Sequence, residues 1–191
     1  MTIKYSDIVK KVRAEGKKKF IYAIVFVVIS GVGLLVEFEG SKTVLVVDAV
    51  VCPAVIFAAY WVFMRVGKNL NEMWESIGIT DKNEIPDILG GAECIHGDDP
   101  LLLMTDSMIL NFHTLHAYRL TNIRSLYKRT QTDEYGKTVT GYSVEAFYVD
   151  RPNAWDVIIE TDDEAVCAEI RRKIAKAYEK AGGTELIIDS K

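Results

Sequence analysis

Two apolar segments near the N-terminus constrain the fold of this chain more than any other feature. Residues 20–36 contain no charged side chain, and twelve of these seventeen residues are Phe, Ile, Leu or Val. Residues 43–64 contain eleven more such residues and one charge, Asp48. A helix rises about 1.5 Å per residue, so each segment is long enough to cross most of the hydrocarbon core of a bilayer. The sequence therefore predicts a two-helix transmembrane hairpin over residues 20–66, with its turn near Gly40.

Two other structures could also account for the apolar segments. A cleaved secretion signal has a shorter apolar region and small residues at the cleavage site, whereas the first segment ends in LLVE and a second one follows. A soluble helical hairpin would carry a polar stripe on each helix, and neither segment has one. Insertion is also favoured energetically, because each large apolar residue gains roughly 0.3 to 0.6 kcal/mol whereas an Asp costs about 3 kcal/mol at the membrane centre and less near a helix end.

The distribution of charge predicts the orientation of the hairpin. Residues 1–19 carry seven Lys or Arg against two acids, whereas residues 67–191 carry fourteen basic and twenty-two acidic residues. Cytoplasmic flanks of membrane helices are enriched in Lys and Arg, so we expect a multi-pass protein of the cell (plasma) membrane with both termini cytoplasmic. The candidate contacts with the membrane surface are the flanking cations Lys10, Lys11, Arg13, Lys17, Lys18, Lys19, Arg65 and Lys68.

Several details of this region have more than one interpretation. Residues 1–19 form either a basic amphipathic helix on the inner leaflet or a solvated tail that supplies the orienting charges. Asp48 either extends to the headgroup region or serves an ion relay, and the apolar segments contain no second charge for a relay. Residues 67–91 are predicted to continue the second helix to about Gly78 and then to form a linker.

From residue 92 the pattern predicts strands followed by one helix. LLLM and MILNF flank Thr105-Asp106-Ser107, which indicates a tight hairpin. YSVEAFYV and WDVIIE alternate apolar and polar residues, so each predicts a strand with one apolar face. Thr161 and Glu164 have the spacing of a capping box at the start of the closing helix. The predicted apolar faces consist of Tyr142, Val144, Ala146 and Tyr148, then Trp155, Val157 and Ile159, and in the helix Val166, Ile170, Ile174 and Tyr178.

The segments LLLMTDSMILNF, AYRLTNIRSLYKR and WDVIIETDDEAVCAEIRRKIAKAY resemble the bacterial pleckstrin-homology-like (PH-like, or GRAM-like) domains. In that family a Thr-Asp-x-x-Ile/Leu hairpin precedes a short strand, and a helix ends the domain. The resemblance implies an α+β chain, with a PH-like, partly open antiparallel barrel in residues 92–191 and a C-terminal helix that caps it. The loop that would bind lipid in other members carries Asp98 and Asp99 here, which would repel an inositol phosphate, and the closing helix lacks the tryptophan of the eukaryotic domains.

Catalytic and metal-binding motifs are sparse in this sequence. His113 and His116 lie three residues apart and only His96 remains as a further histidine, which is too few for a typical metal site. We therefore predict no metal, no cofactor and no enzymatic activity. Arg124, Lys128 and Arg129 form a candidate ligand face, but the acidic body argues against nucleic acid as the ligand.

The expected function follows from the membrane anchor and the PH-like body. We expect a membrane-anchored cytoplasmic binding or scaffold module that recruits a protein, peptide or lipid headgroup at the inner leaflet of the lipid bilayer. The alternative is an accessory or sensory subunit of a larger membrane complex, such as a transporter or an envelope machine. The sequence specifies neither the ligand nor the oligomeric state.

Overall fold

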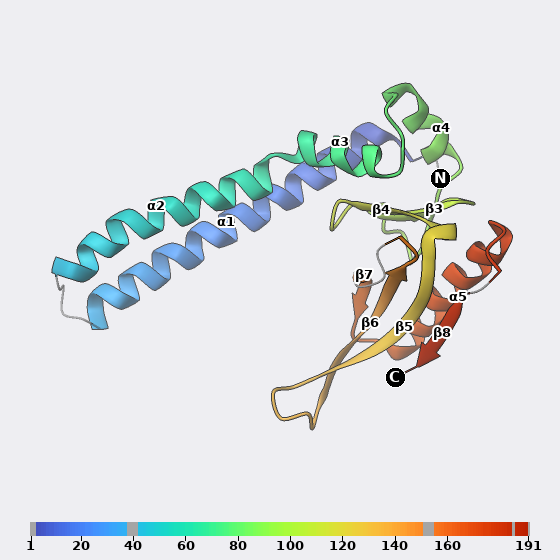
Figure 1. Ribbon diagram of the computed structural model, residues 1–191. Helices are drawn as coiled ribbons and strands as arrows, with labels where there is room; N and C mark the ends of the chain where they lie inside the picture. The colour runs from blue at the N-terminus through green and yellow to red at the C-terminus, as the bar shows by residue number, and fades with distance from the viewer. Residues whose placement is uncertain (1–2, 38–41, 151–154, 185, 191) are drawn as a thin grey trace. The chain divides into compact units, whose positions relative to one another are not determined.

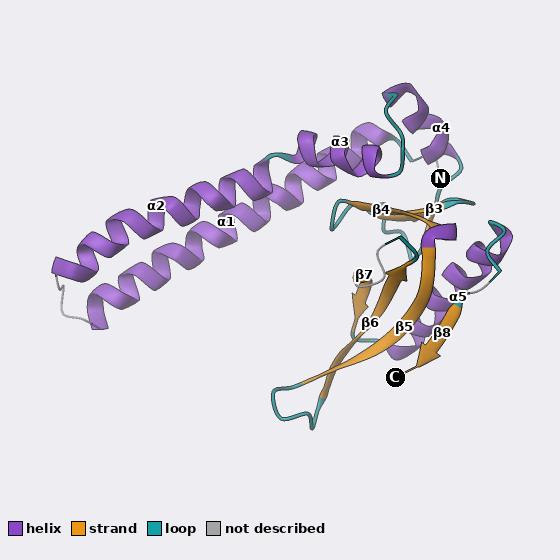
Figure 2. Ribbon diagram, in the orientation of Figure 1, coloured by secondary structure: helices purple, strands orange, loops and turns teal. Residues whose placement is uncertain are grey.

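The computed structural model describes the backbone of residues 3–37, 42–150, 155–184 and 186–190. It describes the side chains of the same residues apart from 33–37, 42–48, 62, 189 and 190. The chain forms a helical unit, Ser6–Glu72, and an α+β unit made of Met1–Tyr5 and Met73–Lys191. Helices are purple and strands orange in Figure 2, and the same elements carry labels in Figure 1.

Helix α1 (Tyr5–Glu37) contains both the basic segment and the first apolar segment. It continues without interruption through residue 19, where the sequence pattern changes from cationic to apolar. The predicted boundary between a basic segment and a membrane helix is therefore not a boundary of secondary structure. A basic segment lying flat on a leaflet beside a membrane-crossing helix would need an interruption that α1 does not contain.

Helix α2 (Lys42–Met64) packs antiparallel against α1. The rings of Phe20 and Tyr60 meet edge to face with centroids 5.8 Å apart. One turn away, a Cβ on Gly16 would lie 2.5 Å from the carbonyl oxygen of Phe63, so the two backbones approach closely there. Both contacts agree with a hairpin centred near residue 40, as predicted, although Gly40 itself lies outside the described residues.

The second helix ends earlier than the sequence pattern predicts. Helix α2 stops at Met64, and helix α3 spans Val66–Ser76. The carbonyl oxygen of Arg65 accepts hydrogen bonds from the amides of Lys68 and Asn69, at 3.0 and 3.1 Å, and so begins the new helix. Within the described side chains no single helix has the length and apolar composition of a membrane span, whereas Ala49–Trp61 and Val66–Ser76, inclined at 49°, meet both criteria as a bent pair.

The predicted linker contains two short helices. The 3-10 helix η1 (Lys82–Glu84) is followed directly by helix α4 (Ile85–Gly90). Ile85 and Leu89 are buried, so α4 contributes to the packing of the α+β unit. Pro86 stands in the first turn of α4, where a missing amide hydrogen costs no helical hydrogen bond.

The first sheet of the α+β unit is an antiparallel meander. Its strands are β1 (Glu93–Cys94), β2 (Leu102–Met104), β3 (Met108–Asn111) and β4 (His116–Arg119), in the order β1-β2-β3-β4. The predicted hairpin at Thr105-Asp106-Ser107 is confirmed: the hydroxyl of Thr105 accepts the amide of Met108 at 3.0 Å and closes the turn. The 3-10 helix η2 (Leu120–Asn122) then leads into the second sheet.

The second sheet is mixed and is covered by the closing helix. Strands β5 (Ile123–Thr132), β6 (Val139–Tyr148), β7 (Trp155–Thr161) and β8 (Ile187–Ser190) lie in the order β7-β6-β5-β8, with β8 parallel to β5. Helix α5 (Glu164–Lys180) lies between β7 and β8 in the chain. The described residues thus give an α+β unit with two four-stranded sheets that do not close into one barrel.

Both sheets and α5 contribute to a single hydrophobic core. The apolar face predicted for α5 is confirmed at Ile170, Ile174 and Tyr178, which are all buried. The face predicted for β6 is confirmed at Val144, Ala146 and Tyr148, which are buried, and Tyr142 is half-buried against the same core. The core consists of Ile95, Leu102, Met104, Ile109, Tyr118, Leu120, Ile123, Leu126, Val144, Ala146, Tyr148, Ile158, Cys167, Ile170 and Ile174.

The face predicted for β7 is wrong at Trp155 and Val157, before a bulge in the strand, whereas Ile159, after the bulge, packs against the core as predicted. A register shift between Val144 and Glu145 of β6 leaves Ile158 as an extra residue in β7. Ile158 is therefore buried, and Asp156 lies opposite buried Ala146 on the inner side of the sheet. Trp155 lies on the other side and is 46% exposed. A bulge of one residue exchanges the two faces because side chains alternate along a strand.

The predicted cap of α5 is also wrong by two residues. Asp163, not Thr161, occupies the N-cap position, and its carboxylate accepts the amides of Ala165 and Val166 at 2.8 and 3.3 Å. The hydroxyl of Thr161 accepts the amide of Asp163 at 3.1 Å instead. The helix therefore begins at Glu164.

Candidate functional site

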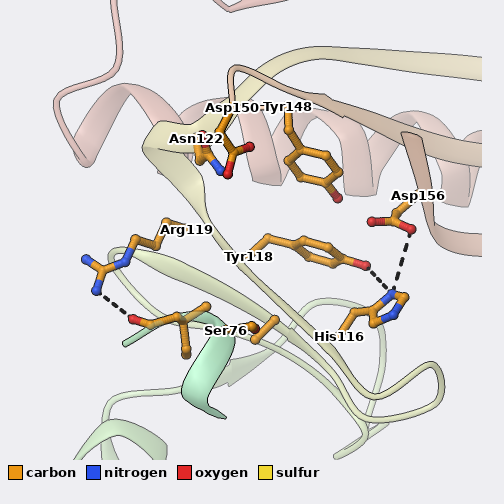
Figure 3. Close-up of a pocket in the computed structure, with 10 residues that line it drawn as sticks. Ser76, His116, Tyr118, Arg119, Asn122, Tyr148, Asp150 and Asp156 are labelled. Carbon is orange, nitrogen blue, oxygen red and sulfur yellow. Dashed lines mark hydrogen bonds and ion pairs between the residues drawn. The ribbon is translucent and has the colours of Figure 1, made fainter. Parts of the chain in front are cut away.

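A pocket of about 410 Å³ opens beside one edge strand of each sheet, namely β4 and β7, in the described chain. Strand β4 supplies four of the lining residues. The others lie at the ends of α3, η2 and β6, directly after α3 and β6, and in β7 (Figure 3). The lining residues are Ser76, Ile77, His116, Ala117, Tyr118, Arg119, Asn122, Tyr148, Asp150 and Asp156. All of them belong to the α+β unit.

Two stacked tyrosines form the rigid part of the pocket wall. The rings of Tyr118 and Tyr148 are nearly parallel, with 18° between their planes and 5.2 Å between their centroids. Both side chains are buried, because alternation along β4 and β6 directs them toward the core. Two rings held in this way give the pocket a fixed apolar surface.

His116 connects this wall to the carboxylate of Asp156. Its Nδ1 atom lies 3.1 Å from the hydroxyl of Tyr118 and 3.7 Å from Oδ1 of Asp156 (dashed lines in Figure 3). Both contacts use the same ring nitrogen. A proton relay of the Asp-His type needs one partner on each ring nitrogen, so these three side chains do not form one. Their arrangement suits binding better than proton transfer.

Arg119, the arginine among the described lining residues, is directed away from Asp156. The guanidinium Nη2 atom of Arg119 donates a hydrogen bond of 2.6 Å to the carbonyl oxygen of Ile77. Gly78 follows with a φ of +82°, and a Cβ there would lie 3.4 Å from the same nitrogen. Figure 3 shows the guanidinium of Arg119 and the carboxylate of Asp156 on opposite sides of Tyr118.

The described polar groups of the pocket include both donors and acceptors of hydrogen bonds. The carboxylates of Asp150 and Asp156 only accept when ionised, whereas the amide of Asn122 both donates and accepts. The cation of Arg119 already serves Ile77. Among the described lining residues, the carboxylate of Asp156 is therefore a candidate acceptor for a group that donates hydrogen bonds.

The structure does not bring the predicted ligand face together. Lys128 forms an ion pair with Glu164 of α5, and Arg129 on the opposite side of β5 lies 3.5 Å from Glu145. Arg124 is exposed near the start of the strand, within the register irregularity between Ile123 and Ser125. None of the three lines the pocket described above. In addition, both paired cations already have carboxylate partners.

A second pocket, of about 390 Å³, lies between α5 and the β2–β3 hairpin. Three lysines of α5 line it, but two of them have protein partners. Lys180 lies 2.6 Å from the carboxylate of Asp106, and Lys173 donates to the carbonyl oxygen of Ile95 at 3.1 Å. Glu93 also lines the pocket. Lys173 and Lys180 therefore connect α5 to the first sheet and its loops.

The cations that flank the hairpin lie on exposed positions of the helical unit. The six predicted in α1, namely Lys10, Lys11, Arg13, Lys17, Lys18 and Lys19, are all exposed. The Nζ atom of Lys18 lies 5.7 Å from the ring centre of Tyr22. The guanidinium of Arg65 lies 3.8 Å from the ring centre of Trp61. Lys68 pairs with Glu72 at 3.1 Å.

The remaining predicted site residues are Asp48 and the three histidines. Asp48 belongs to α2, but its side chain lies outside the described part of the chain. Nε2 of His113 lies 2.7 Å from the carboxylate of Asp99, and His96 is exposed. Among the described residues no group of three or more His, Cys, Asp or Glu could hold a metal ion.

Sequence reasoning missed the central residues of the pocket, Tyr118, Asp156 and Tyr148 as a cluster. The available signal was Asp156 itself, a charge inside the otherwise apolar strand WDVII. Comparisons of the chain with protein-family models, with curated proteins and with solved structures find no match. The geometry above therefore carries the functional argument.

Proposed function

We propose that this chain is a membrane-anchored binding module. In this proposal the helical unit inserts into the plasma membrane, and a PH-like α+β unit binds a protein or peptide at the cytoplasmic surface. One observation carries the proposal: the apolar surface that α1 and α2 leave uncovered.

That surface extends along the described parts of both helices. Fourteen large hydrophobic side chains among the described residues between 21 and 64 are more than 40% exposed. Such a surface is unfavourable in water, because contiguous apolar patches on soluble proteins are much smaller, but it suits contact with lipid chains. The residues are Ile21, Tyr22, Val25, Phe26, Val28, Ile29, Val32, Val50, Val51, Val55, Phe57, Tyr60, Trp61 and Met64.

Aromatic and cationic side chains support an orientation. The antiparallel packing of Phe20 on Tyr60 brings Tyr22, Trp61 and Arg65 to the same end of the helical pair as the N-terminal lysines. Tryptophan and tyrosine favour the headgroup level, and Lys and Arg favour the cytoplasmic side. These preferences favour a hairpin with both termini in the cytoplasm.

The order of elements supports the PH-like part of the proposal. A four-stranded antiparallel sheet is followed by strands β5 to β7 and then by α5, which packs on them, and β8 follows α5 as a parallel strand beside β5. The pocket beside β4 and β7 provides a recess for a ligand. Tethering would raise the effective concentration of this unit toward partners at the membrane surface.

Alkaline extraction of membranes from a bacterial host that expresses the full chain tests the anchor. The chain should stay with the membranes, and replacing Phe26 and Ile29 by Asp should release it, since each central charge costs about 3 kcal/mol. Tyr135→Asp is the matched control, because Tyr135 is also strongly exposed, at 79%, but belongs to the α+β unit. Release of the unchanged chain by alkali would refute the proposal. A stable partner that co-purifies in mild detergent would instead favour the accessory-subunit alternative.

A further inference from the structure

We infer that the pocket between β4 and β7 binds an organic cation, namely the guanidinium or ammonium group of an Arg or Lys side chain in an extended protein segment. The inference rests on the proposed function as a binding module and adds the class of ligand. It depends on the placement of Asp156, on the balance of charge in the pocket and on the two strands beside it.

Asp156 occupies a position that an apolar residue would normally take. It lies opposite Ala146, which is fully buried, and therefore points to the inner side of the second sheet. Its side chain is only 25% exposed, and its Oδ1 atom lies 3.7 Å from Nδ1 of His116. A carboxylate held at an inner position beside a cavity costs desolvation free energy unless a donor or a cation satisfies it.

The surrounding charges favour a cation. Among the described lining residues the carboxylate of Asp156 lies beside the tyrosine rings, whereas the guanidinium of Arg119 donates to the carbonyl oxygen of Ile77. The tyrosine rings offer an apolar surface for the methylene groups of a lysine or arginine side chain. A guanidinium or ammonium group supplies only donors, which matches the carboxylate of Asp156.

The strands on either side favour an extended segment over a free amine. In the described chain β4 and β7 are both terminal strands of their sheets, so each has one row of backbone groups without a strand partner. An extended peptide can add to such an edge through its main chain and place alternate side chains into adjacent pockets. His116 and Asp156 belong to these two strands.

An inward carboxylate on an edge strand also has a structural explanation. Such charges discourage edge-to-edge pairing with other chains. That role requires no ligand, so binding measurements distinguish it from the inference.

The experiment follows backbone amide resonances of the full chain in detergent micelles at about pH 8, where an ordinary histidine is neutral. The probes are a short extended peptide with one central arginine, the same peptide with citrulline, and acetyl-arginine amide. The arginine peptide should shift the amides of His116–Arg119 and of the strand around Asp156, and the citrulline peptide should bind about tenfold more weakly. Asp156→Asn should weaken binding of the arginine peptide by a similar factor. Asp98 is exposed and lies outside the pocket, so Asp98→Asn should leave binding unchanged.

The inference would be overturned if the arginine and citrulline peptides bound equally well. It would also be overturned if the arginine peptide bound equally well to the unchanged chain and to Asp156→Asn. Equal binding of acetyl-arginine amide and the arginine peptide would refute an extended segment as the ligand. An unaltered side-chain amide resonance of Asn111 in Asp156→Asn shows that the variant is folded. If the chain resists alkaline extraction but these titrations show no binding, only the class of ligand is refuted. If alkali releases the chain from membranes, the proposed function itself is refuted.

Discussion

The side-chain amide of Asn111 donates a hydrogen bond of 3.0 Å to the carbonyl oxygen of Ile158. Asn111 ends β3 in the first sheet, and Ile158 is the extra residue of the bulge in β7 of the second sheet. Asn111 also accepts the amides of His113 and Thr114, at 3.1 and 3.3 Å, through its side-chain oxygen. One buried side chain thus joins the two sheets and closes the turn before β4, and it holds the bulge that directs Asp156 inward.

Replacing Asn111 by Ala should destabilise the α+β unit by about 2 kcal/mol, because it leaves buried backbone groups without partners. The readout is thiol labelling of Cys167 in a background with Cys52→Ser and Cys94→Ser. Cys167 is fully buried, and burial raises the pKa of its thiol, so labelling reports opening of the core. The labelling rate should rise roughly thirtyfold.

Asn83→Ala is the control for this experiment, because Asn83 is exposed in η1. In Asn83→Ala the labelling rate of Cys167 should match the rate in the chain that keeps both asparagines. A rate for Asn111→Ala no higher than for Asn83→Ala would show that the link between the sheets contributes nothing to stability.

Replacing Gly16 by Ala should separate α1 from α2. The added Cβ would lie 2.5 Å from the carbonyl oxygen of Phe63, and backbone cannot move aside as a flexible side chain can. Gly67→Ala is the matched control, since nothing lies within 4 Å of a Cβ there and both changes gain similar helix propensity. The free energy of SDS-induced unfolding should differ between the variants by about 1 to 3 kcal/mol in favour of Gly67→Ala. Equal stabilities, with the nuclear Overhauser contact between Phe20 and Tyr60 retained, would contradict the close approach.

The sequence predicted the elements of this chain better than their faces. The two apolar segments, the turn at Thr105-Asp106-Ser107 and the apolar face of α5 depend on patterns that local periodicity reports directly. The face of β7 depends on the bulge at Ile158, and a bulge is decided by cross-strand contacts such as the one with Asn111. A strict alternation therefore placed Trp155 inside and Asp156 outside, which is the reverse of the structure.

The pocket was harder to predict for the same physical reason. Its residues come from segments separated in the chain, and only the pairing of β6 with β7 brings Asp156 near Tyr148. The cationic cluster of β5 looked continuous in sequence, but Lys128 and Arg129 point to opposite sides of the strand. Spacing along one strand cannot report which of its neighbours supplies a carboxylate.

The turn of the β5–β6 hairpin should loosen at low pH. The backbone amide of Lys137 donates to the carboxylate of Asp133 at 2.8 Å, and this hydrogen bond lowers the pKa of Asp133 below its ordinary value. The ionised form therefore stabilises the folded turn. That contribution is complete above the ordinary pKa of an aspartate, about 3.9, and is lost as pH falls through the lower pKa of the folded state.

Nuclear magnetic resonance titration checks this prediction. The Asp133 carboxyl should titrate below an aspartate in an unstructured peptide, and the Lys137 amide should lose protection from exchange over the same pH range. Asp133→Asn should remove this pH dependence. Titration of Asp133 at or above the peptide value would contradict the assigned hydrogen bond.

The most direct measurement of the central claim is the sidedness of two single cysteines in a cysteine-free chain in intact cells. Gly40→Cys lies at the predicted turn, outside the described residues, and Asp162→Cys is exposed on the α+β unit. A thiol reagent that cannot cross membranes should label Gly40→Cys in intact cells and should label Asp162→Cys only after permeabilisation. Labelling of both positions from the same side of the membrane would contradict a hairpin that crosses the bilayer with a cytoplasmic binding unit.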